Sequence, residues 1–126
     1  MPAKYIIVQH KVPSKPDDPP VYYPRLKSTG EIGLREIAGD IARISTVSTS
    51  DTVAVIESLI QKIPDYLADG LIVRLGDLGS FYLSIQAEGS PDEASVNRFK
   101  IKRNKLNFRA GKLIRKMLKS IVYVKD

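Results

Sequence analysis

Apolar residues recur along this chain at two different periods, which divide it into short strands and longer helices. The runs YIIV at residues 5–8 and VYY at residues 21–23 are separated by the breaker-rich segment PSKPDDPP. They predict a strand, a polar loop and a second strand, and the prolines disfavour a tight hairpin. A last apolar run, IVYV at residues 121–124, is a candidate strand that would pair with the first.

Two helices are predicted in the middle of the chain. Apolar residues at i, i+3, i+4 and i+7 predict an amphipathic helix over residues 33–45. A second apolar stripe follows, with Ser50 as the predicted N-cap and Gly70 as the residue that ends the helix. Pro64 lies inside this stripe and is expected to kink the helix or split it near Ile63, because proline removes a backbone hydrogen bond. The two helices are expected to form a hairpin that buries both stripes against something larger.

The sequence GDLG at residues 76–79 separates two further strand patterns, residues 71–75 and 80–87. A phosphate-binding loop would need a helix directly after the glycines, whereas SFYLSIQA is rich in strand formers. GDLG is therefore interpreted as the turn of an antiparallel pair, with Gly79 free to adopt a positive φ.

Basic and apolar residues alternate in RFKIK at residues 98–102, which predicts a strand with one apolar and one positive face. Lys100 and Lys102 would share the positive face, and residues 105–109 are a candidate continuation of the strand. A basic helix is predicted over residues 111–119. Its expected inward side chains are Leu113, Met117 and Leu118, and its expected outward ones are Arg115, Lys116 and Lys119.

Length and composition narrow the class of protein. The chain has 126 residues, 43% of them hydrophobic, which suits one domain of modest size. It contains no cysteine, so disulfides, thiolate catalysis and sulfur-ligated metals are excluded. No apolar stretch is long enough to cross a membrane and no signal-peptide pattern is present, so a cytoplasmic protein is expected.

The net charge of +6 is concentrated in one block of the sequence. Residues 98–119 hold ten Lys/Arg and no Asp/Glu, whereas residues 1–97 hold nine Lys/Arg and thirteen Asp/Glu. A surface of a single sign attracts polyanions, whereas an ordinary solvated face mixes both signs. The candidate nucleic-acid-binding residues are Arg98, Lys100, Lys102, Arg103, Lys105, Arg109, Lys112, Arg115, Lys116 and Lys119.

Catalytic patterns are missing from the sequence. His10 is the only histidine and is expected to be a surface residue of an edge strand. Asp77 is interpreted as a turn residue, and Asp92 with Glu93 as a solvated loop tip. We therefore expect no enzyme activity, no metal site, no cofactor and no small-molecule substrate.

In their order along the chain, four segments resemble the bacterial histone-like HU and integration host factor family. They are LREIAGDIARIS and VIESLIQKIPDYLADG for the two helices, LGDLGSFYL for the glycine turn, and FRAGKLIRK for the end of an arm and the last helix. FRAGK, residues 108–112, is the most specific part. The N-terminal extension and the IVYVKD tail look like the diverged HU-related branch of Bacteroidetes.

The resemblance implies an α+β, HU-like (IHF-like) fold: a helical hairpin packed on a β-sheet, with a shortened arm, a C-terminal helix and an N-terminal β extension. It also implies an intertwined dimer whose arms embrace the minor groove, with a proline at each arm tip as the wedge. The family's Arg-Asn-Pro tip is absent here. The matching segment is GSPDEASVN, where Pro91 is the possible wedge and two carboxylates follow it.

Two hypotheses follow for residues 31–126, the expected HU-like DNA-binding domain, which residues 1–30 precede as an N-terminal β extension. The first is a non-catalytic, nucleoid-associated protein that binds double-stranded DNA as a homodimer through sequence-tolerant phosphate contacts. The second is an HU-like dimeric structural or interaction module that has lost DNA bending and binds a protein or RNA. The basic block favours the first hypothesis, and the acidic arm tip favours the second.

Overall fold

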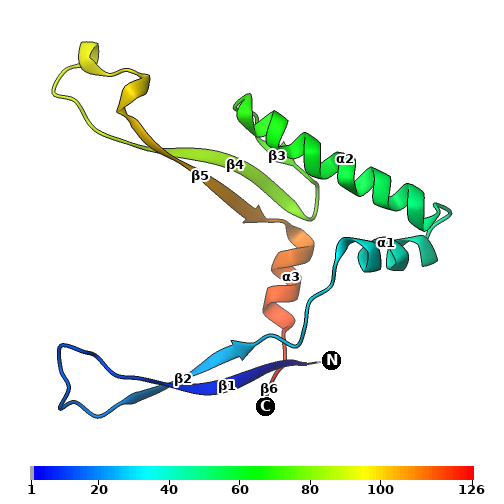
Figure 1. The fold of residues 1–126 in the computed structure, drawn as a ribbon, viewed down its shortest axis with the longest axis horizontal. Helices are drawn as coiled ribbons and strands as arrows, with labels where there is room; N and C mark the ends of the chain where they lie inside the picture. The colour runs from blue at the N-terminus through cyan, green and yellow to red at the C-terminus, as the bar shows by residue number, and fades with distance from the viewer. Residues whose placement is uncertain (1) are drawn as a thin grey trace. The chain divides into compact units, whose positions relative to one another are not determined.

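The computed structural model describes residues 2–126 and forms an α+β fold that divides into two compact units (Figure 1). The N-terminal unit contains the chain up to Gly33 together with Leu118–Asp126, and the helical unit contains Leu34–Met117. The strands are β1 Ala3–His10, β2 Val21–Lys27, β3 Val73–Arg74, β4 Gly79–Ala87, β5 Ile101–Ala110 and β6 Tyr123–Lys125. The α-helices are α1 Leu34–Arg43, α2 Thr49–Ala68 and α3 Lys112–Ser120.

The N-terminal unit is built on a three-stranded sheet of order β2-β1-β6. β1 and β2 are antiparallel across the whole of β2, and β6 is parallel to the first part of β1. The predicted strand, loop and strand are confirmed, and so is the pairing of the first and last apolar runs. Pro24 lies in β2, an edge strand of this sheet, where its missing N–H breaks no ladder bond. The expected edge position of His10 is only partly right, because β1 is the central strand and β6 stops short of His10.

In the helical unit, α1 and α2 pack against each other as the predicted hairpin (Figure 1). The predicted N-cap was wrong: Ser48, not Ser50, caps α2, and its Oγ accepts a hydrogen bond from the Asp51 N–H at 3.1 Å. Capping by Ser48 adds a first turn and sets the Asp51 carboxylate at the positive end of the helix dipole. Ser50 therefore lies inside the helix.

Pro64 does not split α2, which continues through it as a single helix of 20 residues. One lost backbone bond is tolerated here because the helix has several turns on the N-terminal side of the proline. The predicted end at Gly70 is confirmed. Gly70 has φ +81°, its N–H donates to Leu67 O at 2.9 Å, and the Leu71 N–H donates to Tyr66 O at 3.1 Å.

The second sheet has the order β3-β4-β5, and β4 and β5 form a long two-stranded arm (Figure 1). The turn before β4 is GDLG, and Gly79 has the predicted positive φ, at +145°. A Cβ at Gly79 would lie 2.4 Å from Arg109 O, so this glycine is also required by the close approach of β5. The opening strand is shorter than predicted, since only Val73 and Arg74 pair with β4.

The single chain buries very little apolar surface. Ala38 and Leu67 are the buried hydrophobic residues among those that the structure describes, and Ile44 is 86% exposed. The main contacts between α2 and the sheet are with β3 and β4. The expected packing of a helical hairpin over a sheet is thus incomplete within one chain, and a domain of this size normally buries far more.

Candidate nucleic-acid interface

The ten basic residues of the block fall on three consecutive elements. Arg98 and Lys100 lie in a 3₁₀ turn at the end of the arm, four lie on β5, and four lie on α3. The four on β5 are Lys102, Arg103, Lys105 and Arg109, and the four on α3 are Lys112, Arg115, Lys116 and Lys119. All are exposed except Lys100, which is half-buried.

The register of β4 and β5 sorts the arm residues onto two faces. One face is polar and basic and carries Arg103, Lys105 and Arg109 opposite Gln86, Ser84 and Ser80. On this face the Asn107 amide donates to Ser84 Oγ at 2.9 Å, which ties the two strands together. We call this set of β4 and β5 residues the basic arm face.

The opposite side of the arm is apolar. There Phe81 pairs with Phe108, at 4.9 Å between ring centroids, and Leu83 pairs with Leu106. Both leucines are exposed in the single chain, at 42% and 58%. We call these four side chains the apolar arm face.

The predicted shared strand face of Lys100 and Lys102 was wrong. Residues 98–100 form a 3₁₀ turn, so β5 begins only at Ile101. Asn97 causes this departure, because its side-chain oxygen accepts the Phe99 N–H at 3.0 Å and favours a turn. Lys102 lies at the irregularity in the β4–β5 register and has no partner residue on β4; its Nζ lies 3.5 Å from Glu88 Oε1. Among residues 2–126 this is the one ion pair made by a member of the basic block.

The arm tip joins Ala87 to Ile101 through two 3₁₀ turns, Glu93–Ser95 and Arg98–Lys100. Pro91 is exposed at this tip. Asp92 caps the first turn, and hydrogen bonds from the Ser95 side chain and backbone hold the pKa of its carboxyl below the ordinary 3.8. Asp92 is therefore ionised at neutral pH, and the negative charge beside Pro91 is a fixed feature of the tip.

Phe99 is a further exposed apolar side chain at the tip, where the sequence pattern had predicted a strand face. It is 74% exposed, and the Arg98 guanidinium lies 5.0 Å from its ring centroid. This cation–π contact holds an aromatic ring at the surface next to a positive charge.

The GDLG turn packs against the start of α3 and accepts hydrogen bonds from its backbone. The Gly111 N–H donates to Leu78 O at 2.9 Å, and the Leu113 N–H donates to Asp77 O at 3.1 Å. A Cβ at Gly111 would lie 2.4 Å from Asp77 O. Two of the backbone N–H groups that could hold a phosphate at this helix start, those of Gly111 and Leu113, are thus already engaged, and the glycines serve close packing.

The predicted inward side of α3 was wrong for the single chain. Leu113, Met117 and Leu118 are exposed by 62%, 44% and 58%, and the half-buried residue of the helix is Ile114. The periodicity identified an apolar stripe correctly, but the stripe has little to pack on within one chain.

No group of three His, Cys, Asp or Glu that could hold a metal occurs within residues 2–126. No helix in the same range is long and apolar enough to span a membrane.

With this geometry, the molecule falls in the class of HU-like α+β proteins: a helical hairpin, a glycine-turned two-stranded arm and a following basic helix. The family model that matches residues 1–125 is HU-HIG, described as an HU domain fused to wHTH, Ig or a glycine-rich motif. The chain belongs to this family.

A solved structure gives the same fold. It is a protein from Bacteroides vulgatus, provisionally described as a bacterial DNA-binding protein, with a TM-score of 0.65 and 16% identity. The match covers 98% of this chain and 47% of that one, so this chain spans about half the length of its structural relative. At this identity the likeness shows the fold alone. No curated protein sequence matches.

Proposed function

We propose that this protein is a non-catalytic, histone-like DNA-binding protein of the nucleoid, with its basic arm face on the phosphates of double-stranded DNA. The observation that carries the proposal is the basic arm face itself, on which Arg103, Lys105 and Arg109 are exposed and free of ion pairs among the described residues. Phosphate contacts carry no sequence information, so binding should tolerate any sequence. The description of the Bacteroides vulgatus relative as DNA-binding supports the same function.

The proposal includes the remaining basic residues as secondary contacts. Arg98 and Lys100 at the tip, and Lys112, Arg115, Lys116 and Lys119 on α3, would extend the contact with DNA. Lys102 is the weakest member, because Glu88 already neutralises it. In this proposal residues 31–126 are the DNA-binding domain and residues 1–30 are the extension, and the protein acts in the cytoplasm without a membrane or a cofactor.

A homodimer is the second part of the proposal. It is supported by the exposed apolar arm face and by the minimal core of the single chain. Two chains that share one core would double the number of basic arm faces and could condense DNA by holding separate segments.

Binding to a labelled 30-base-pair duplex, followed by fluorescence anisotropy, tests the DNA part. Three phosphate contacts per arm give about six per dimer, so the affinity should fall about 10³-fold between 50 and 200 mM salt. Affinity that does not respond to salt would contradict phosphate binding.

The alternative function is an HU-like dimeric module that no longer bends DNA and binds an acidic protein or RNA. The observation in its favour is the ionised Asp92 beside Glu93 at the arm tip, since carboxylates repel an anionic groove. In the duplex experiment this function would appear as no binding even at the lower salt.

Pro91 is proposed as a wedge whose entry into DNA is hindered by these carboxylates. Fluorescence energy transfer between dyes at the two ends of the duplex should report a small bend for the unchanged protein. Glu93→Gln should enlarge the bend, and Pro91→Ala in that background should remove the gain, because it deletes the apolar wedge. Glu93 is chosen because it can change without the loss of the Asp92 cap.

Phe99→Ala is the matched comparison for Pro91→Ala, because Phe99 also presents an exposed ring at the arm tip. A bend that depends on Phe99 and not on Pro91 would disprove the assignment of the wedge to Pro91.

A further inference from the structure

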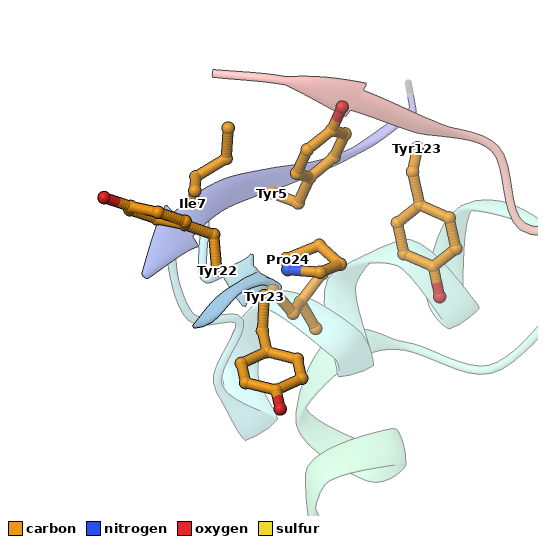
Figure 2. Close-up of a pocket in the computed structure, with 7 residues that line it drawn as sticks. Tyr5, Ile7, Tyr22, Tyr23, Pro24 and Tyr123 are labelled. Carbon is orange, nitrogen blue, oxygen red and sulfur yellow. The ribbon is translucent and has the colours of Figure 1, made fainter. Parts of the chain in front are cut away.

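The sheet of the N-terminal unit presents one face that is made of aromatic and aliphatic side chains. Alternation along the strands and their register bring together the residues that face one side of β1, β2 and β6. These are Tyr5, Ile7, Tyr22, Pro24, Leu26 and Tyr123, which we call the tyrosine face. Figure 2 shows them around an open groove of about 660 Å³, whose rim also includes Tyr23.

Within its own unit the tyrosine face has no covering layer. Tyr22 is 62% exposed and Tyr123 is 55% exposed, although each belongs to a strand of the sheet. A three-stranded sheet is normally stabilised by the burial of its apolar face, so an exposed face of this kind indicates a binding surface.

The charges of the three strands are of one sign. β1, β2 and β6 carry four Lys/Arg and no Asp/Glu. By the register Lys4, Arg25 and Lys27 lie on the opposite side of the sheet. The carboxylate of Asp126, just after β6, is engaged by Lys27 and by Lys4, the latter at 3.8 Å. The hydrogen bond and charge of Lys27 lower the pKa of this carboxyl below its ordinary 3.8. Lys125 is opposite Tyr5 in the register and so lies on the tyrosine face itself.

We propose that the tyrosine face binds single-stranded DNA by stacking its unpaired bases on Tyr22 and Tyr123, with Lys125 on the phosphates. Aromatic rings for stacking beside a cation for the phosphates, here Lys125, are the combination that binds single strands without sequence preference. The bases of an intact duplex are stacked on each other and are not available to these rings. This site is therefore separate from the basic arm face.

A second copy of the chain fits the same face less well. Two tyrosine faces packed on each other would each bring Lys125 and no carboxylate to the contact, so like charges would meet without compensation. The choice of DNA over RNA rests on the proposed function, and the experiment includes an RNA oligomer for that reason.

Intrinsic tyrosine fluorescence gives a direct measurement of stacking. The chain has six tyrosines and no tryptophan, and four of the six line the groove. Titration of the full chain with an oligothymidine of about 15 nucleotides should quench this fluorescence saturably, because a stacked base quenches the ring it covers. The affinity from quenching should agree with the anisotropy of a labelled oligomer.

Two double variants separate stacking from other contacts. Tyr22→Ala with Tyr123→Ala should weaken oligothymidine binding at least tenfold, whereas Tyr22→Phe with Tyr123→Phe keeps the rings and should bind as the unchanged protein does. Duplex binding should be the same for all three proteins. Loss of oligothymidine binding with intact duplex binding therefore tests the tyrosine face alone, separately from the proposed function. Tyr66→Phe, on α2, should leave the quenching intact.

Four results would overturn the proposal. They are no quenching by oligothymidine, equal binding by the alanine variant, binding of oligouridine alone, and a smaller sedimenting species for the alanine variant, which would mean that a second copy covers the face.

Discussion

Changing Arg103 and Lys105 together to glutamate is expected to abolish duplex binding at physiological salt. The two residues lie on the same side of β5, and the structure gives them no anionic partner among the described residues. In a dimer the double substitution reverses four charges at once. Each lost phosphate contact removes counterion release, and each new carboxylate repels the backbone.

A milder pair of substitutions makes this prediction quantitative. With Arg103→Gln and Lys105→Gln, four contacts per dimer are lost, so the slope of log affinity against log salt should become shallower by about 3.6. The measurement is the same anisotropy titration at several salt concentrations. An unchanged slope would mean that DNA does not contact this face.

Lys102 offers a matched control one residue away. Lys102→Glu makes the same charge change as Arg103→Glu, but at a side chain whose charge is already paired with Glu88. Arg103→Glu should weaken duplex binding about tenfold or more, whereas Lys102→Glu should weaken it much less. Equal losses would show that overall charge, rather than the basic arm face, controls the affinity.

The sequence predicted an element correctly where its local hydrophobic pattern agrees with the tertiary structure. The two helices, the glycine-turned arm and the pairing of the two chain ends follow from periods of 3.6 and 2, which depend only on which side of an element is apolar. Gly70 was predicted as the end of the helix and Gly79 as a turn residue with positive φ, and both have a positive φ in the structure.

The predictions were wrong at the N-cap of α2, which is Ser48, at the 3₁₀ turn that follows Asn97, and for the strand face of Lys102. The N-cap of α2 and the 3₁₀ turn after Asn97 each depend on one hydrogen bond from a backbone N–H to a side-chain oxygen. Several neighbouring residues have side chains that could form such a bond, so the sequence alone does not identify which one does. Lys102 was grouped with Lys100 on one strand face because the start of β5 was set too early. Lys100 lies in the preceding 3₁₀ turn, and the β4–β5 register is irregular beside Lys102.

The tyrosine face was missed although its signal is present in the sequence. Tyr22, Pro24 and Leu26 alternate with other residues at a period of two, as do Tyr5 and Ile7. The alternation continues through Pro24, and a proline in the sequence normally indicates the end of a strand. Its place in an edge strand removes that objection.

Leu106→Asp is expected to prevent dimer formation and, with it, stable folding. Leu106 is exposed in the single chain and pairs with Leu83 on the apolar arm face. If that face is buried against a second chain, each dimer would bury two new carboxylates without partners. At roughly 2 kcal/mol or more for each carboxylate, the dimer dissociation constant should rise by at least about 10³-fold.

Leu106→Asp should lower the helix content of the protein as well as prevent dimer formation. The single chain has only Ala38 and Leu67 as buried apolar residues among those described, so a separated chain has little to hold its helices. Analytical ultracentrifugation should therefore report a dimer for the unchanged protein and a monomer for Leu106→Asp. Circular dichroism should report reduced helix content for the variant at the same concentration.

Asn107→Asp is the control that introduces the same carboxylate at the next position on β5. Asn107 lies on the basic arm face opposite Tyr82, and its amide donates a hydrogen bond to Ser84 on the other strand. This variant should stay dimeric and folded, with DNA binding weakened by its added charge. If Leu106→Asp also stays dimeric and folded, the apolar arm face is not the dimer contact, and the small core of the single chain would have to be completed through the exposed stripes of α2 and α3 instead.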